Sequence, residues 1–132
     1  MHVLLTEPDA ELARELGDEL SAAGCRVTRA ATAAETDARL RADRPDLLLV
    51  DLAVPDCDGL VLIARLCARN APPIMALCRS RRRADPVLAF RLGAEDVVRY
   101  PCVAGEIAAR VDALLRWRKE PAGPRRRLAR AG

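Results

Sequence analysis

Short runs of apolar residues alternate along the chain with longer stretches in which apolar residues recur every three or four positions. The short runs have the length of strands, and the longer stretches have the period of amphipathic helices. The third and fourth runs are apolar enough to form strands buried on both faces. The pattern predicts five strands, at Val3–Thr6, Arg26–Ala30, Leu47–Asp51, Ile74–Cys78 and Asp96–Arg99.

The predicted helices fall between and after these strands. The first is expected to begin after an N-cap at Asp9, and Thr32 and Glu35 have the spacing of a capping box at the start of the second. The third and fourth are expected at about Gly59–Asn70 and Ala84–Leu92. The faces expected to pack against the sheet are formed by Leu12, Leu16 and Leu20 in the first helix and by Ile107, Val111 and Leu114 in the fifth.

Five strand–helix units with short connections predict a parallel α/β sheet that is covered on both faces, because right-handed crossovers place helices on both sides. In such a sheet, ligands bind at the carboxyl ends of the strands, near the switch point between the first and third strands. The residues expected there are Glu7, Pro8 and Asp9 after the first strand, Asp51 at the end of the third, and Cys78 and Arg79 at the end of the fourth.

Charge is distributed unevenly along the 132 residues, which carry 22 basic and 19 acidic side chains. The whole excess of three positive charges lies in residues 120–132, so residues 1–119 are formally neutral. A neutral body argues against a nucleic-acid surface spread over the fold. We expect residues 1–119 to form one soluble domain and residues 120–132 to be a basic linker or disordered tail. No apolar run is long enough to span a membrane.

Lysine, histidine and cysteine usage excludes several mechanisms. Lys119 is the only lysine, so no earlier lysine can take part in a reaction. The five cysteines lack metal-ligand spacing and the only histidine is His2, so a zinc site is not expected. The start of the chain lacks a signal-peptide pattern, which favours the cytoplasm and free thiols.

Acids converge at the expected ligand edge of the sheet. Such carboxylates typically hold a hard cation, which in turn can hold a phosphoryl group. For Asp9, helix capping is the competing interpretation. Asp51 follows four apolar residues, so an acid there requires a functional reason or a buried partner.

With these residues in place, the chain resembles the receiver domain of response regulators in two-component signalling, over residues 1 to about 119. The resemblance implies a flavodoxin-like (βα)5 three-layer sandwich, with a parallel sheet of order 2-1-3-4-5, and a signalling domain rather than an enzyme. It also implies that Asp51 accepts the phosphoryl group with Mg2+ beside it. The residues that carry it are Val3-Leu4-Leu5-Thr6-Glu7, the block Asp51-Leu52-Ala53-Val54-Pro55-Asp56-Cys57-Asp58-Gly59, Gly93-Ala94-Glu95-Asp96, and Pro101.

Several functional positions of this family are altered here. Pro8 replaces the second acid of the usual pair, which leaves Glu7, Asp51 and the backbone carbonyl of Ala53 as metal ligands, with Asp9 as a substitute. We therefore expect at most weak Mg2+ binding. By the same resemblance, the switch hydroxyl aligns with Cys78, the small residue after it with Arg79, the switch aromatic with Val97 and the lysine with Tyr100.

The combined changes indicate a degenerate receiver. We hypothesise that Arg79, or an arginine from the run 81–83, reaches over Asp51 and forms the charge pair that lysine and metal would form. For the run, a solvated loop face is the alternative. A redox role for Cys78, beside Arg79, is a further but less favoured reading.

Three functions compete for this sequence. The favoured one is a phosphorylation-independent dimerisation or partner-binding module in transcription regulation. The alternative is a conventional switch phosphorylated on Asp51. A flavodoxin-like cofactor binder is disfavoured, because Glu7 and Asp9 stand where an anionic flavin phosphate would need a Gly/Ser/Thr-rich loop.

The last helix is similar to that of OmpR-like receivers. This implies a homodimer through the fourth helix, fifth strand and fifth helix, with Asp96, Glu106 and Arg110 at the interface; ion pairing within one chain is the alternative. A sensor histidine kinase is the expected partner. DNA would be bound only through a domain that is not in this chain, and no membrane contact is expected.

Overall fold

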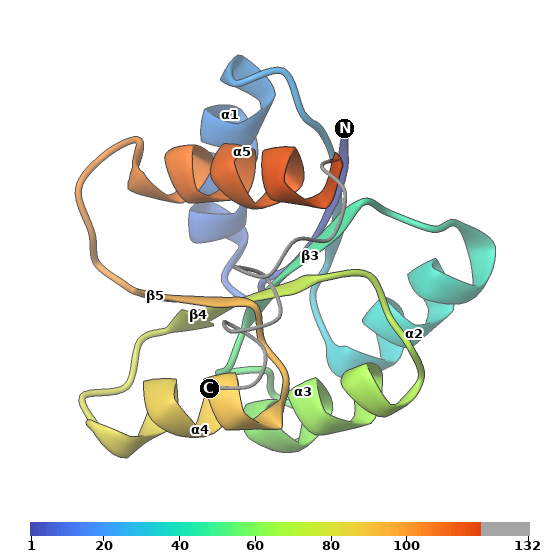
Figure 1. The fold of residues 1–132 in the computed structure, drawn as a ribbon, viewed down its shortest axis with the longest axis vertical. Coiled ribbons are helices and arrows are strands. Elements are labelled where there is room, and N and C mark those ends of the chain that lie inside the picture. The colour runs from blue at the N-terminus through green and yellow to red at the C-terminus, as the bar shows by residue number, and fades with distance from the viewer. Residues whose placement is uncertain (120–132) are drawn as a thin grey trace.

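The computed structural model describes residues 1–119, so the predicted linker or tail at 120–132 lies outside the described residues. The sheet is parallel, with the order β2-β1-β3-β4-β5 (Figure 1). This confirms the predicted flavodoxin-like fold. The strands are β1 (His2–Thr6), β2 (Arg26–Ala30), β3 (Leu47–Asp51), β4 (Ile74–Cys78) and β5 (Asp96–Arg99); the helices are α1 (Ala10–Ala22), α2 (Ala33–Ala42), α3 (Gly59–Ala68), α4 (Ala84–Leu92) and α5 (Glu106–Lys119).

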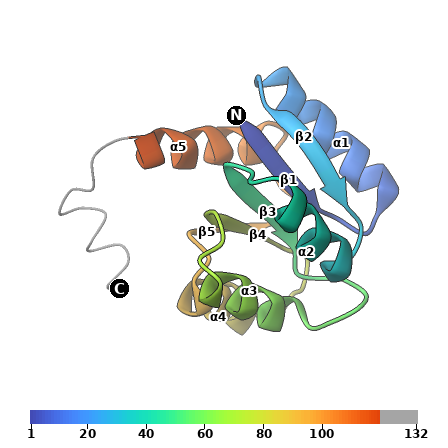
Figure 2. The same cartoon turned by 90° about the vertical axis from the view of Figure 1, so that its right-hand side faces the viewer.

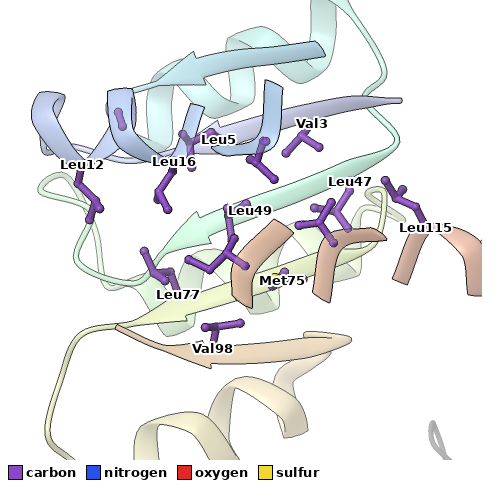
Figure 3. Packing of buried hydrophobic residues seen from close by; sticks show 14 residues of the cluster. Val3, Leu5, Leu12, Leu16, Leu47, Leu49, Met75, Leu77, Val98 and Leu115 are labelled. Carbon is purple, nitrogen blue, oxygen red and sulfur yellow. The ribbon is translucent and has the colours of Figure 1, made fainter. Parts of the chain in front are cut away.

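Helices cover both faces of the sheet: α1 and α5 lie on one face, and α2, α3 and α4 lie on the other (Figures 1 and 2). Successive strand residues point to opposite faces, so each strand contributes to both cores. The core under α1 and α5 (Figure 3) includes Val3, Leu5, Leu47, Leu49 and Met75, and the opposite core includes Leu4, Leu48, Val50, Ile74 and Ala76. As predicted, β3 and β4 are buried throughout.

The structure refines the sequence prediction for two helices. In α5, Leu115 joins Ile107 and Val111 in the buried core, because these three residues keep a four-residue spacing, and the predicted Leu114 packs against the same core while remaining partly buried. Helix α3 ends at Ala68 rather than Asn70, where the backbone takes a φ of 56° and leaves the helical region. Within residues 1–119, no helix combines the length and the apolar character that crossing a membrane requires.

The caps of α1 and α2 position the site loops. The carboxylate of Asp9 accepts hydrogen bonds from the amides of Glu11 and Leu12, as the prediction of an N-cap requires. Thr32 Oγ1 accepts a hydrogen bond from the Glu35 amide, as predicted. The Glu35 carboxylate accepts from the Ala31 amide rather than that of Thr32, so the reciprocal half of the capping box is displaced by one residue.

Candidate functional site

Two buried acids lie side by side at the carboxyl edge of the sheet. Parallel pairing places Thr6 of β1 opposite Val50 of β3, so the next residues, Glu7 and Asp51, reach the edge together. Both residues are 0% exposed. Two carboxyl groups buried this closely repel each other when both are charged, so a proton or a cation must compensate them.

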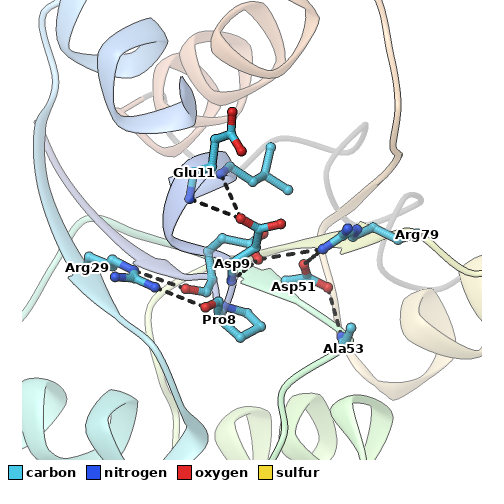
Figure 4. A network of polar contacts seen from close by, with 9 residues as sticks. Pro8, Asp9, Glu11, Arg29, Asp51, Ala53 and Arg79 are labelled. Atoms are coloured by element: carbon cyan, nitrogen blue, oxygen red, sulfur yellow. Dashed lines mark hydrogen bonds and ion pairs between the residues drawn. The ribbon is translucent and has the colours of Figure 1, made fainter. Parts of the chain in front are cut away.

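The compensating cation in the structure is the guanidinium of Arg79, which follows β4. Its Nη1 atom lies 3.4 Å from Asp51 Oδ2 and 3.9 Å from Glu7 Oε2. The Arg79 side chain is 39% exposed, whereas both acids are fully buried, and its guanidinium points towards Asp51 (Figure 4). The other oxygen of Asp51, Oδ1, accepts a hydrogen bond from the Ala53 amide at 2.8 Å. Asp51 is therefore contacted on both carboxylate oxygens.

Burial raises the pKa of Glu7 from its usual value of 4.5 to about 8, and a hydrogen bond with Asp51 contributes to the same shift. This shift favours the protonated form of Glu7 at neutral pH. As a carboxylate it would leave its Oε1 atom buried without a hydrogen-bond partner among the described residues. A protonated carboxyl removes this penalty, because it can donate to Asp51.

The loop between β1 and α1 is fixed by two further contacts. Arg29, at the end of β2, donates hydrogen bonds to the backbone oxygens of Glu7 and Pro8, each at 3.1 Å (Figure 4). The amide of Asp9 donates to Glu7 Oε2 at 3.0 Å, while its carboxylate caps α1. The Asp9 carboxylate is thus used as the N-cap of α1 and does not point towards Asp51.

The donor groups at this edge fit a magnesium ion poorly. The described part of the chain holds no cluster of three or more acids, histidines or cysteines suited to a metal. Pro8 offers no side-chain oxygen, the raised pKa of Glu7 favours its protonated form, and the Arg79 guanidinium lies within 4 Å of both acids. Mg2+ needs near-octahedral oxygen ligands, and a neighbouring guanidinium opposes its charge. Weak Mg2+ binding stays a prediction.

The residues that align with the family's other switch positions are packed rather than directed at the acids. Cys78 is 1% exposed and its Sγ atom lies 3.9 Å from the Ser80 carbonyl oxygen. Val97 packs against the core under α2, α3 and α4, and Tyr100 packs against the core under α1 and α5. In the run 81–83, no side chain forms an ion pair within residues 1–119. The arginine at the acids is therefore Arg79.

Sequence reasoning missed the residue that holds the Arg79 loop. Arg99, at the end of β5, donates hydrogen bonds to the carbonyl oxygens of Ser80 at 2.7 Å and Arg82 at 3.1 Å. It also missed Asp56, which accepts from the Ala33 and Ala34 amides and so ties the loop after β3 to the start of α2. These hydrogen bonds lower the pKa of Asp56. Neither residue could be identified from residue types, because in both cases a side chain bonds to backbone groups of another segment.

The three residues expected at a dimer interface pair with each other in one chain. Arg110 Nη1 lies 3.3 Å from Asp96 Oδ1, and Arg110 Nε lies 3.5 Å from Glu106 Oε2. Nearby, α4 exposes the apolar side chains of Val87, Leu88, Phe90 and Leu92. An exposed apolar surface beside a charged network is typical of an interaction surface.

The chain matches known receivers in sequence and in structure. Residues 3–112 match the model of the response regulator receiver domain. The transcriptional regulatory protein PhoP of Escherichia coli O157:H7 is 38% identical over 117 residues, which are 88% of this chain and 52% of that protein. The virulence transcriptional regulatory protein PhoP of Salmonella typhimurium (strain LT2) is 37% identical over the same shares. The chain thus spans about half the length of these curated relatives.

Solved structures give the same result. The receiver domain of the TMAO respiratory system response regulator TorR is 28% identical, with a TM-score of 0.82 over 90% of this chain and 98% of that one. The receiver domain of a Francisella response regulator, at 22% identity and a TM-score of 0.84 over 89% and 98%, shows the shared fold. These matches, together with the strand order and the acids at the sheet edge, show that the chain belongs to the response regulator receiver domain family of two-component signalling.

Proposed function

We propose that residues 1–119 form an atypical receiver that is held in one conformation without a phosphoryl group. The observation that carries the proposal is the placement of Arg79 Nη1 at 3.4 Å from Asp51 Oδ2 and 3.9 Å from Glu7 Oε2. In this arrangement one guanidinium supplies the positive charge that a metal ion and a lysine would supply. Arginine suits this role because its planar, permanently charged group matches carboxylates.

The contacts of Asp51 oppose its use as a nucleophile. Oδ1 accepts from the Ala53 amide and Oδ2 faces Arg79, so whichever oxygen attacks a phosphoryl donor is already engaged with a partner. Arg99 restrains the loop that carries Arg79. Together these contacts favour a receiver whose β4–α4 loop is held in place by arginines rather than switched by phosphate.

A conventional switch phosphorylated on Asp51, with weak Mg2+ dependence, is the second candidate. One observation favours it: the Arg79 side chain is 39% exposed and can swing away from the acids into solvent. Glu7, Asp51 and the Ala53 carbonyl are the groups that would then face the metal, with Asp9 kept at its helix.

The output of the domain is proposed by analogy with the PhoP proteins, which are named as transcriptional regulators. We propose an OmpR-like homodimer through α4, β5 and α5, to which Asp96, Glu106 and Arg110 contribute their charges. A sensor histidine kinase is the proposed upstream partner, and DNA would be reached through a domain outside this chain. The proposed location is the cytoplasm.

Intact mass measured after incubation with a small phosphodonor and Mg2+ tests the proposal. We expect that neither the unchanged protein nor the matched Asp51→Asn variant gains a phosphoryl group. A stoichiometric gain that is lost in Asp51→Asn would establish the switch and sink the proposal. A second arm with Arg79→Ala asks whether removal of the guanidinium restores uptake.

A further inference from the structure

A pocket between α2 and α3 lies at the opposite edge of the sheet from Asp51. Its volume is about 230 Å³, and it is formed by the last turns of both helices and the segment that leads into β4. The two helices lie on the same face of the sheet (Figure 2). Because it lies at the amino ends of the strands, this pocket shares no residue with the acids and Arg79.

The floor of the pocket is apolar. Leu66 is 1% exposed, and Leu40 packs against the core under α2, α3 and α4. Pro72 completes this surface at the start of β4. An apolar group of a ligand would displace water from this surface, which is favourable because apolar surface is then buried.

The rim of the pocket is cationic. Its one acid, Asp37, is neutralised by Arg65 at 2.9 Å and lies 3.8 Å from Arg69. Arg41 forms no ion pair or side-chain hydrogen bond with residues 1–119, and the guanidinium of Arg44 contacts only the Asn70 carbonyl oxygen, at 3.4 Å. Two guanidinium groups are therefore available at the rim without an acidic partner in the described part of the chain.

This charge selects the occupant. Residues 120–132 carry the positive excess of the chain, so the arginines at the rim would repel them. For the same reason, this face would repel the same face of a second copy of the chain. The volume lies below the range of about 300 to 1,000 Å³ that is usual for drug-sized ligands. A small ligand with a negative group and an apolar body satisfies both limits.

We propose that the α2–α3 pocket binds a small organic carboxylate with an aromatic or branched apolar body. The carboxylate is held by Arg41 and Arg44, and the body rests on Leu40, Leu66 and Pro72. Guanidinium matches a carboxylate with two parallel hydrogen bonds, which gives the site its preference for an acid over a neutral ligand. The bound acid joins the ends of α2 and α3, independently of the chemistry at Asp51.

Fluorine NMR with 4-(trifluoromethyl)benzoate as the probe tests the site, and the neutral 4-(trifluoromethyl)benzyl alcohol is its matched control. We expect saturable binding of the benzoate at millimolar concentration and binding of the alcohol about fivefold weaker or less. In 1H–15N spectra the benzoate should shift the amides of Leu40 and Ala71 and leave that of Ala53 unchanged.

The variants replace exposed arginines, because substitutions at exposed positions should leave the fold intact. Arg41→Gln and Arg44→Gln should each weaken benzoate binding about fivefold, while Arg91→Gln, beside the apolar side chains of α4, should leave it unchanged. The proposal is overturned by equal affinity for acid and alcohol, by no saturable binding, or by a loss confined to Arg91→Gln.

Discussion

The guanidinium of Arg79 lies 3.4 Å from the carboxylate of Asp51, which is 28 positions earlier in the chain and fully buried. The parallel sheet brings them together, since β3 and β4 are neighbours and both residues stand at the same edge. The contact places a permanent positive charge where two buried acids, Glu7 and Asp51, would otherwise lack one. Removal of the Arg79 side chain should therefore lower the free energy of unfolding.

Substitution of Arg79 by alanine should lower the free energy of unfolding by about 1 to 3 kcal/mol, because it leaves buried acids without their cation. The partial exposure of Arg79 keeps the loss below that of a fully buried pair. Urea denaturation measures it. Arg83→Ala, in the same loop, serves as the control and should change stability by less than about 0.5 kcal/mol. Equal losses in the two variants would refute the account of Arg79.

Glu7 gives the stability of the protein a dependence on pH. The folded state holds the Glu7 proton up to about pH 8, whereas an unfolded chain releases it near 4.5. Between these values the folded state binds more protons, so the free energy of unfolding falls as pH rises, by up to about 1.4 kcal/mol per pH unit. This contribution is complete below about pH 4.5 and is lost as pH passes 8.

The Glu7→Gln variant isolates this effect, because the amide does not titrate. Urea denaturation from pH 5 to pH 8 should show a steeper loss of stability in the unchanged protein than in the variant. Parallel curves would mean that Glu7 is ionised in the folded state throughout this range.

Helix α5 is capped by a residue of α1. Glu19 accepts hydrogen bonds from the amides of Gly105 at 3.0 Å and Ala108 at 2.9 Å. Loss of an N-terminal cap costs about 1 to 2 kcal/mol, so Glu19→Ala should lower stability by that amount and speed hydrogen exchange at the start of α5. Glu15→Ala, at an exposed position of the same helix, is the control. Unchanged exchange at the Ala108 amide in Glu19→Ala would show that the cap contributes nothing.

Two glycines should respond to alanine in opposite directions. A Cβ at Gly59, the first residue of α3, would overlap the backbone carbonyl of Leu52, so Gly59→Ala should lower the free energy of unfolding by about 1 to 3 kcal/mol. Gly17 lies inside α1 with open space around it, so Gly17→Ala should raise stability by about 0.5 to 1 kcal/mol. Thermal unfolding of both variants checks the signs, and a stabilised Gly59→Ala would contradict the packing described.

The proposed dimer predicts a difference between two exposed apolar positions. Leu88 lies on α4 and Val61 lies on α3, and their exposed fractions are 41% and 59%. In sedimentation equilibrium, Leu88→Asp should raise the dimer dissociation constant by about tenfold or more, while Val61→Asp should not change it. A monomeric unchanged protein, or equal effects of the two variants, would argue against the α4–β5–α5 interface.

The fold was predictable because it depends on local patterns. Apolar runs placed the strands, and side chains such as Asp9 and Thr32 placed the helix starts. The end of α5 shows the limit of this reasoning: Leu114 packs against the core as predicted, but its neighbour Leu115 is the more deeply buried residue, and contact with the sheet decides between them.

The site was predictable only in part. The positions of Glu7, Asp51 and Arg79 at one edge followed from the topology, which the sequence indicated. The hydrogen bonds of Arg99 to Ser80 and Arg82 did not, because they join a side chain to backbone oxygens and leave no mark in residue types. The raised pKa of Glu7 also required the structure, since burial is its main cause.

The central claim is that the site holds one conformation without a phosphoryl group. The most direct measurement compares 1H–15N spectra of the protein before and after addition of a small phosphodonor with Mg2+. The reporters are the amides of Ala53, which donates to Asp51, of Ser80, which follows Arg79, and of Val97 in β5. We predict that these amides keep their positions. Shifts at all three that are absent in Asp51→Asn would show a phosphate-driven switch and contradict the account.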